Sequence, residues 1–396
     1  MQTGYERNLN SIPVGDLGII ALRSCEELGR KIDAHIVNWR SERVHEHQGS
    51  PLLLGYDKTS YLVSTDVPRF GSGEAKGQVN DSVRGKDIYI LVDVCNYSLT
   101  YSLNGYTNRM SPDDHYQDLK RVIAAIGGKA RRVNVIMPFL YESRQFTRAG
   151  RESLDCAIAL QELTKMGVEN IITFDAHDPR VQNAIPLHGF ETVLPVYQFI
   201  KGLFRAAPDL TIDPEHLTVI SPDEGAAGRA IYMANLLGVD MGMFYKRRDY
   251  ASVKDGKHPV VAHEFLGRDI EGQDVVLIDD MIVTGNSMIE AARQLKKRKA
   301  KRVLICATFG LFTNSLEKFD KAYEEELFDT LVTTNLVYQS PELLSKPYYT
   351  GCDLSKYIAL IIDTLNHDGS MSDLLTPTAR INKFLAKHRK TDQAIE

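Results

Sequence analysis

Short apolar runs alternate along this chain with segments whose apolar residues recur at helical spacing. Such runs predict strands that are covered on both faces, as in a parallel sheet. We place strands at 88–94, 133–138, 171–174, 217–221, 275–278 and 303–309, and helices at 17–37, 116–126, 153–166, 226–237, 287–298 and 355–365. This alternation predicts right-handed βαβ units and an α/β fold of mainly parallel sheets flanked by helices.

The strand and helix pattern falls into two blocks. A chain of 396 residues exceeds the usual domain length of about 100–150 residues, so two domains are expected. We place them at 1–194 and 195–368, followed by a polar tail at 369–396. Hydrophobic residues make up 43% and charged residues 25%, which is typical of globular proteins and not of disordered ones.

Acidic side chains slightly outnumber basic ones. Lys and Arg number 47 against 52 Asp and Glu, and the formal net charge is -5. This balance argues against a nucleic-acid partner, so any anion site must be local. Five scattered cysteines without a C-x-x-C pair indicate free thiols in a reducing cytoplasm. No apolar stretch reaches the roughly 18 residues that a membrane span needs, so no membrane partner is expected.

The most informative segment follows the strand expected at 275–278. Two acids, Asp279 and Asp280, come first, and a turn of Thr284, Gly285, Asn286 and Ser287 leads into the next helix. Carboxylates can accept hydrogen bonds from vicinal hydroxyls, and backbone N–H groups at a helix start can bind phosphate. The ordinary alternative is an acid pair at a strand end beside a helix cap. The Thr-Gly-x-Ser continuation favours a sugar-phosphate site, because glycine lets a phosphate approach the backbone.

A basic loop follows the strand expected at 133–138. It contains Arg144, Arg148 and Arg151, with Gln145 beside the first of them. Guanidinium groups bind phosphate oxygens through paired hydrogen bonds, so this loop can hold a triphosphate. The alternative is a basic loop that is simply solvated.

Three more polar segments contain residues with candidate chemistry. His177 has metal-ligand chemistry, although a loop histidine is usually just solvated. Asp223 suits a metal or a ribose hydroxyl, or alternatively caps the following helix. Lys246, Arg247 and Arg248 are adjacent cations, which repel one another unless an anion or solvent neutralises them. Each segment therefore keeps a structural and a functional interpretation.

These segments together resemble the ribose-phosphate diphosphokinase (phosphoribosyl pyrophosphate synthetase) family. Residues 279–287 are similar to its phosphoribosyl diphosphate loop, 141–148 to its ATP-binding segment, 175–178 to its metal segment and 246–248 to the base of its mobile catalytic loop. Residues 69–74 resemble its adenine-binding loop, which serves a neighbouring subunit. Val283 departs from the family's acid, and Phe146 and Thr147 replace an acidic and a basic residue.

The resemblance implies transfer of the diphosphoryl group of MgATP to the C1 hydroxyl of ribose 5-phosphate, giving phosphoribosyl diphosphate and AMP. It implies two tandem type I phosphoribosyltransferase-like domains in a homo-oligomer, often a hexamer built of dimers. The implied residues are Phe70, Glu74, Arg144, Gln145 and Arg148 for ATP; Asp279, Asp280, Thr284, Gly285, Asn286 and Ser287 for ribose 5-phosphate; His177 and Asp223 for Mg²⁺; and Lys246 and Arg248 for catalysis.

Two other functions remain open from the sequence. A nucleobase phosphoribosyltransferase needs the 279–287 loop but not Arg144, Gln145 or the Lys246 cluster. A non-catalytic regulatory relative would keep the fold and the ligand site, and the departures at Val283, Phe146 and Thr147 leave room for it. Formation of AMP from ATP and ribose 5-phosphate would separate the diphosphokinase from a nucleobase phosphoribosyltransferase.

Overall fold

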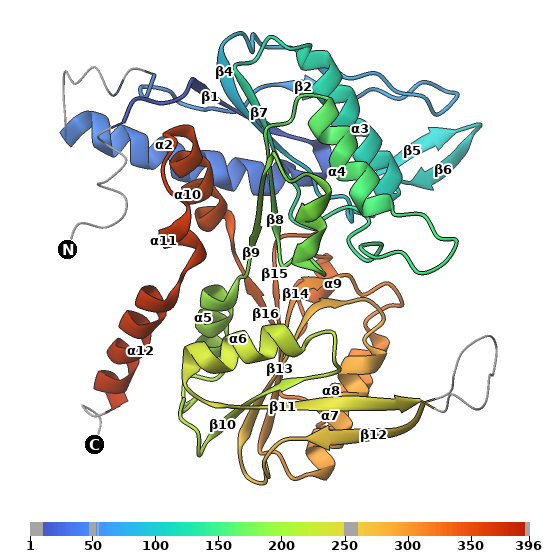
Figure 1. Ribbon diagram of the computed structural model, residues 1–396, viewed down its shortest axis with the longest axis vertical. Helices are drawn as coiled ribbons and strands as arrows, with labels where there is room; N and C mark the ends of the chain where they lie inside the picture. The colour runs from blue at the N-terminus through green and yellow to red at the C-terminus, as the bar shows by residue number, and fades with distance from the viewer. Residues whose placement is uncertain (1–10, 47–52, 54, 249–259, 393–396) are drawn as a thin grey trace. The chain divides into compact units, whose positions relative to one another are not determined.

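The computed structural model describes residues 11–46, 53, 55–248 and 260–392, and the chain folds into two compact units (Figure 1). The first unit contains the described residues up to Leu194 together with 335–338 and 353–376. The second contains 195–334, 339–352 and the described residues from 377 onward. This division differs from the expected domains at 1–194 and 195–368, because two late segments return to the first unit.

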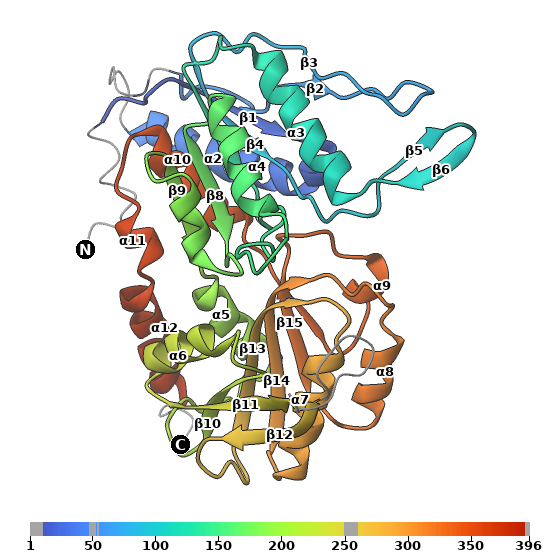
Figure 2. The same ribbon diagram turned by 45° about the vertical axis from the view of Figure 1, so that its right-hand side comes forward.

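The first unit is built on a five-stranded parallel sheet of order β1-β4-β7-β8-β9. Its strands are β1 (Asp16–Ala21), β4 (Lys86–Leu91), β7 (Arg132–Ile136), β8 (Asn170–Phe174) and β9 (Gly189–Val193). Its helices are α2 (Glu26–Glu46), α3 (Pro112–Ile126), α4 (Asp155–Lys165), α10 (Ser355–Asn366) and the short α11 (Ser372–Leu375), with 3₁₀ turns at Arg23–Cys25 and Pro179–Ala184. Helix α3 lies beside α4, and α2 beside α10 (Figures 1 and 2).

Two small antiparallel pairs complete the first unit. They are β2 (Thr65–Asp66) with β3 (Gln78–Val79), and β5 (Thr100–Leu103) with β6 (Tyr106–Arg109). The second pair is a hairpin whose turn residues Asn104 and Gly105 both have positive φ, 50° and 84°. An Asn-Gly turn of this kind matches the twist of the two strands it joins.

The expected helix at 17–37 is wrong at its start. Leu17, Ile19 and Ile20 are buried in β1, which pairs in parallel with β4, and α2 begins only at Glu26. A short apolar run fits a buried strand as well as a helix, so periodicity alone does not separate the two. The expected late helix at 355–365 is confirmed by α10.

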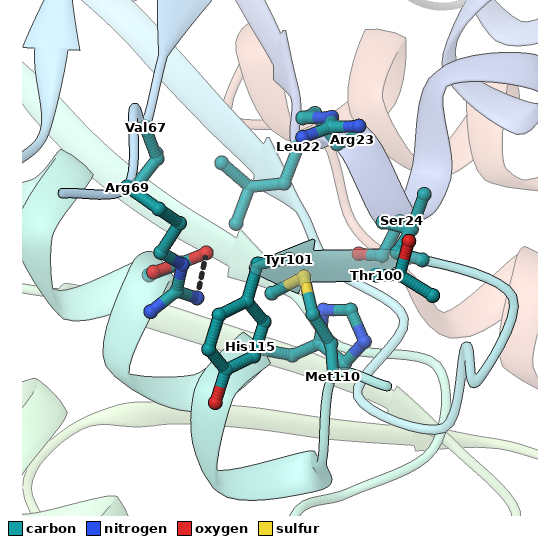
Figure 3. Close-up of a pocket in the computed structure, with 11 residues that line it drawn as sticks. Leu22, Arg23, Ser24, Val67, Arg69, Thr100, Tyr101, Met110 and His115 are labelled. Atoms are coloured by element: carbon teal, nitrogen blue, oxygen red, sulfur yellow. Dashed lines mark hydrogen bonds and ion pairs between the residues drawn. The ribbon is translucent and has the colours of Figure 1, made fainter. Parts of the chain in front are cut away.

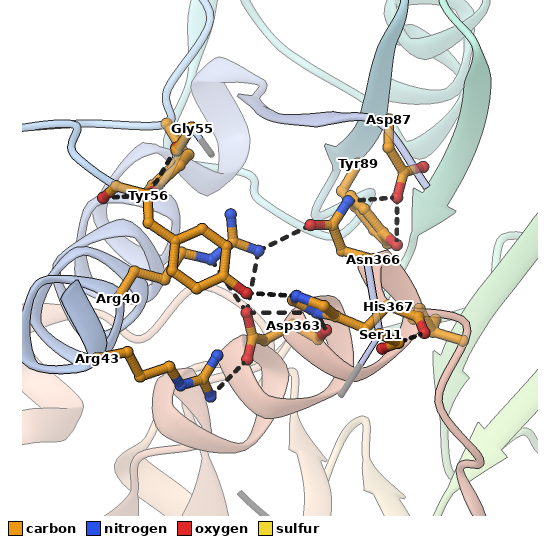
Figure 4. A network of polar contacts seen from close by, with 12 residues as sticks. Ser11, Arg40, Arg43, Gly55, Tyr56, Asp87, Tyr89, Asp363, Asn366 and His367 are labelled. Atoms are coloured by element: carbon orange, nitrogen blue, oxygen red, sulfur yellow. Dashed lines mark hydrogen bonds and ion pairs between the residues drawn. The ribbon is translucent and has the colours of Figure 1, made fainter. Parts of the chain in front are cut away.

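A buried polar network ties α10 to α2 (Figure 4). Arg40 donates to Asp363 Oδ1 through Nε and Nη2 at 3.1 and 3.0 Å, and Arg43 Nη2 donates to Asp363 Oδ2 at 3.0 Å. Asn366 accepts from Arg40 at 2.8 Å and donates to Asp87 on β4 at 2.9 Å. Burial opposes ionisation of Asp363, yet the two guanidinium groups hold its pKa below the usual value. The network therefore fixes the late segment within the first unit.

The second unit is built on a seven-stranded sheet of order β12-β11-β10-β13-β14-β15-β16. Among the described strands of this sheet, β12 alone runs antiparallel to its neighbour. The strands are β10 (Leu217–Ser221), β11 (Asp240–Arg248), β12 (Val260–Leu266), β13 (Asp274–Ile282), β14 (Arg302–Gly310), β15 (Thr330–Thr334) and β16 (Tyr349–Cys352). The helices are α5 (Val196–Ala206), α6 (Ala227–Leu237), α7 (Asn286–Lys297), α8 (Glu317–Glu324), α9 (Pro341–Leu344) and α12 (Thr378–Asp392).

The α/β fold expected from the apolar pattern is confirmed. Every expected strand corresponds to a strand of one of the two large sheets, and the helices expected at 116–126, 153–166, 226–237 and 287–298 correspond to α3, α4, α6 and α7. The core of the second unit fills the space between its central strands and α7 and α8, with Val275, Leu277, Ile305 and Phe319 buried. None of the helices in the described part of the chain has the length and apolar character needed to cross a membrane.

Candidate functional site

An acidic cluster lies at the carboxyl end of two neighbouring strands of the second unit. Asp279 and Asp280 lie in the carboxyl-terminal half of β13, and Asp223 follows β10, which pairs in parallel with β13. Burial and the neighbouring carboxylates of Asp280 and Asp223 raise the pKa of Asp279 to about 8. Neighbouring carboxylates repel one another when they are ionised, which lowers the stability of the fold. A carboxyl group with a strongly raised pKa is typical of a site that binds a ligand or a cation.

The strand that carries these acids is longer than expected. We expected it to end at residue 278, but β13 continues to Ile282, because β14 continues to pair with it as far as Gly310. Asp280 is therefore held within the sheet, 2% exposed. Arg229 on α6 forms an ion pair with it at 3.4 Å. Sequence reasoning missed Arg229, whose only signal is its place in the first turn of the helix that follows Asp223.

The segment after β13 forms a tight turn at the start of α7. Gly285 has a φ of +78°, and a Cβ at this position would lie 2.4 Å from the buried ring of Phe319 on α8. Asn286 begins α7, and its side chain accepts a hydrogen bond from Lys318 Nζ at 2.8 Å. The turn therefore needs glycine for both conformation and space. Sequence reasoning missed Lys318 and Phe319, which approach from a separate helix.

In the first unit, the basic loop follows β7 and His177 follows β8, the neighbouring parallel strand. The Phe146 ring lies 5.6 Å from the His177 ring, centroid to centroid, in an edge arrangement. Arg144 and Arg148 are exposed, and Gln145 is half-buried. The structure therefore brings His177 to the loop that was expected to hold triphosphate.

Aromatic stacking fixes the start of this basic loop. Tyr141 stacks on Tyr116 of α3, with ring centroids 4.3 Å apart and planes 1° apart. Its hydroxyl donates to Asp113 at 2.6 Å. Glu142 follows with a φ of +55°, and its carbonyl accepts from the Gln145 backbone N–H at 2.8 Å. These contacts set the direction in which Arg144 leaves the turn.

The loop at 69–75 is closed by its own backbone. Phe70 N–H donates to the Glu74 carbonyl at 2.7 Å, and Ser72 Oγ donates to the Glu74 carboxylate at 2.8 Å. The Phe70 side chain is 50% exposed. An exposed ring beside an acceptor carboxylate is suited to a planar ligand that carries an amino group.

The last two predicted residues lie on β11. The backbones of Lys246 and Arg248 belong to this strand, opposite His263 and Val260 of β12, while their side chains lie outside the described residues. Within the described residues, no group of three or more His, Cys, Asp and Glu side chains is placed to hold a metal ion by itself.

Comparison with known proteins places the chain among its relatives. Residues 17–167 match the model of the N-terminal domain of ribose phosphate pyrophosphokinase, and residues 196–346 match that of the phosphoribosyl transferase domain. The ribose-phosphate pyrophosphokinase of Mycoplasma genitalium is 31% identical over 275 residues, covering 68% of this chain and 74% of that protein. The chain belongs to the ribose-phosphate pyrophosphokinase family.

Other members of the ribose-phosphate pyrophosphokinase family match over a greater length. The Pasteurella multocida enzyme is 29% identical over 322 residues, 80% of this chain and 92% of the relative. The crystal structure of phosphoribosylpyrophosphate synthetase from Mycobacterium smegmatis superposes with a TM-score of 0.69 at 20% identity, covering 89% of this chain and all of that one. The family resemblance and the fold expected from the sequence are thus confirmed, and a fold of two phosphoribosyltransferase-type domains is established.

Proposed function

We propose that this chain is a ribose-phosphate diphosphokinase that acts on ATP and ribose 5-phosphate. The C1 hydroxyl oxygen of ribose 5-phosphate attacks the β-phosphorus of ATP and loses its proton to solvent. The bond from the β-phosphorus to the oxygen shared with the α-phosphate breaks, releasing AMP and forming phosphoribosyl diphosphate. The observation that carries this proposal is the acidic cluster of Asp223, Asp279 and Asp280 beside the Gly285 turn, in a chain of this family.

The sugar phosphate binds to the second unit in this proposal. Asp279 and Asp280 accept hydrogen bonds from the ribose hydroxyls, and the turn of Thr284, Gly285, Asn286 and Ser287 holds the 5-phosphate at the start of α7. A phosphate there gains backbone N–H donors and the positive end of the helix dipole. Arg229, paired with Asp280, keeps that carboxylate oriented.

ATP binds to residues of the first unit in this proposal. Phe70 stacks on the adenine ring and Glu74 accepts from its amino group, as the adenine-binding loop of the family implies for a neighbouring subunit. The phosphates are held by Arg144, Gln145 and Arg148. Exposed guanidinium groups can donate paired hydrogen bonds to phosphate oxygens. The Tyr141 ring at the start of this loop is already held by stacking on Tyr116. Less conformational entropy of the loop is therefore lost when ATP binds.

Mg²⁺ fits the donors that the chain offers. Asp223 of the second unit would supply carboxylate oxygen, the ligand this ion prefers, near Asp279. His177 of the first unit would supply one ring nitrogen. Water and phosphate oxygens would provide the other ligands, and the bound ion would neutralise charge on the phosphates. Lys246 and Arg248 stabilise the reacting β-phosphoryl oxygens.

We place the enzyme in the cytoplasm as a dimer-based homo-oligomer.

The test is an assay of AMP formed from ATP, ribose 5-phosphate and Mg²⁺. We expect AMP and phosphoribosyl diphosphate in equal amounts, and Lys246→Ala should lower turnover by about 10² to 10⁵, the range for charge-stabilising groups in such transfers. A wild-type protein that forms no AMP but joins a nucleobase to phosphoribosyl diphosphate is a nucleobase phosphoribosyltransferase. One that binds both substrates without turnover is a regulatory relative.

A further inference from the structure

We propose that the β5–β6 hairpin, residues 100–109, is a brace that holds the loop at 69–75 in its nucleotide-binding form, with Tyr101 as the positioning residue. The inference rests on the proposed function, because it takes that loop to bind the adenine of ATP. In the sequence, the hairpin lies between β4 and α3, within residues 97–110. It therefore reaches the loop from a different part of the first unit's sequence.

Arg69, the first residue of the loop, is clamped on two sides (Figure 3). Its guanidinium lies over the Tyr101 ring, 5.0 Å from the centroid. The same group donates to Asp118 of α3 at 2.9 Å and lies 3.7 Å from Asp114. Because the Arg69 side chain is only 12% exposed, the cation–π contact is shielded from water, which strengthens it.

The hairpin also touches the tip of the loop. Gly73 has a φ of +88°, and a Cβ there would lie 2.9 Å from Leu103 Cδ1. The tip of the loop therefore packs closely against the hairpin. Glycine allows this close approach because it has no side chain to meet Leu103. Between these two contacts, Arg69 pairs with Ala75 across the base of the loop in an antiparallel bridge. The hairpin thus contacts both the base and the tip of the loop.

The space enclosed beneath these contacts is too small for a substrate. The pocket lined by Arg69, Tyr101, Met110, His115 and Asp118, among others, has a volume of about 30 Å³, which is room for about one water molecule. The hairpin is itself anchored, since Met110 N–H donates to the Leu99 carbonyl at 2.9 Å and the His115 ring contacts the Asn96 carbonyl at 2.8 Å. A packed and anchored contact of this kind indicates a brace and not a ligand site.

Tyr101→Ala and Leu103→Ala test the brace, with Tyr106→Ala as the matched control, because Tyr106 lies on the same hairpin but is 76% exposed. Amide hydrogen exchange of residues 70–75, followed by mass spectrometry, reports the order of the loop without any substrate. We expect faster exchange in both brace variants and a KM for ATP raised about fivefold, equivalent to about 1 kcal/mol. The turnover number and the KM for ribose 5-phosphate should change less than twofold.

Tyr101→Phe keeps the aromatic ring that contacts Arg69, so it should behave as wild type in both measurements. Together with faster exchange in Tyr101→Ala, this result would assign the effect to loss of the ring. If Tyr101→Ala does not fold, Leu103→Ala carries the test. Unchanged exchange in a folded variant overturns the brace, whatever the activity. Faster exchange in a brace variant with an unchanged KM for ATP overturns the link between the hairpin and nucleotide binding. The proposed function would still hold in that case if the wild-type protein forms AMP. If wild type forms no AMP, the proposed function fails, and the nucleotide part of this inference fails with it.

Discussion

Two groups of buried or half-buried carboxylates in this chain have opposite surroundings. Asp363 in the first unit lies between Arg40 and Arg43, and its pKa is lowered. Asp279 in the second unit faces Asp280 and Asp223, and its pKa is raised to about 8. The first arrangement satisfies the buried charges, whereas the second concentrates like charge at the end of a sheet. Removing an acid of the first kind leaves buried cations unpaired, whereas acids of the second kind are typical of sites that bind a ligand.

The largest effect that we expect on stability is that of Asp363→Asn. The change leaves two buried guanidinium groups without their counter-charge, so the free energy of unfolding should fall by about 3–5 kcal/mol. Denaturant melts measure this loss, and KM values taken well below the melting temperature should stay unchanged. The control is Glu26→Gln on α2, which breaks a 4.0 Å exposed pair with Arg30 and should change stability by about 1 kcal/mol or less. A loss below that level in Asp363→Asn would contradict the structural role.

Asp279→Asn should show the reverse pattern. Turnover should fall by about 10² to 10³, the range for losing one preorganised electrostatic group. Above pH 8, where Asp279 is ionised, the melting temperature should rise, because the change then removes a charge that faces two other carboxylates. Steady-state assays of AMP and thermal melts measure the two effects. Glu271→Gln, an exposed acid of the same unit paired with Lys299, should change neither. A less stable Asp279→Asn with normal turnover would reverse our assignment.

Gly285→Ala should weaken the binding of ribose 5-phosphate. The left-handed backbone costs a non-glycine residue about 1–2 kcal/mol, and the added Cβ would also meet the Phe319 ring. We expect the KM for ribose 5-phosphate to rise about tenfold, equivalent to about 1.4 kcal/mol. Gly272→Ala is the control, since Gly272 has a similar left-handed backbone, with a φ of +76° and nothing near the added atom, but lies outside the turn. If Gly272→Ala raises that KM equally, the turn at Gly285 is not special.

Lys318→Met should have the smallest effect. It removes the hydrogen bond to Asn286 at the start of α7, a contact of about 0.5–1.5 kcal/mol. We expect about a threefold rise in the KM for ribose 5-phosphate and no change for ATP, with initial-rate kinetics as the measurement. Lys321→Met on the same helix is the control, because Lys321 pairs with Glu325 at 3.9 Å and not with the turn. Equal effects of the two variants would show a general loss of surface charge.

Local patterns in the sequence predicted the parts of the fold and of the candidate site that local structure decides. The apolar runs located the central strands of both sheets, and the polar motifs after them located Asp223 and His177 just beyond strand ends and Asp279 within the last part of β13. Contacts between distant segments could not be read in this way. Arg40 and Asp363 are 323 residues apart, and the length of β13 depends on where β14 stops pairing.

Some signals were present in the sequence without being decisive. Asn104 and Gly105 form a strong local hairpin signal, and they do lie in the turn between β5 and β6. The run at the start of the chain fitted both strand and helix until its pairing with β4 was known. Arg229, Lys318 and Phe319 have no motif of their own, because each acts through an acid or a glycine that comes from another element.

Calorimetric titration of the protein with ribose 5-phosphate in the presence of Mg²⁺ tests most directly whether the acidic cluster is the substrate site. We expect one sugar phosphate per chain in wild type and in Asp363→Asn, and no measurable binding in Asp280→Asn. Wild type that does not bind ribose 5-phosphate, or an Asp280→Asn variant that binds it as tightly as wild type, would contradict the assignment of that cluster.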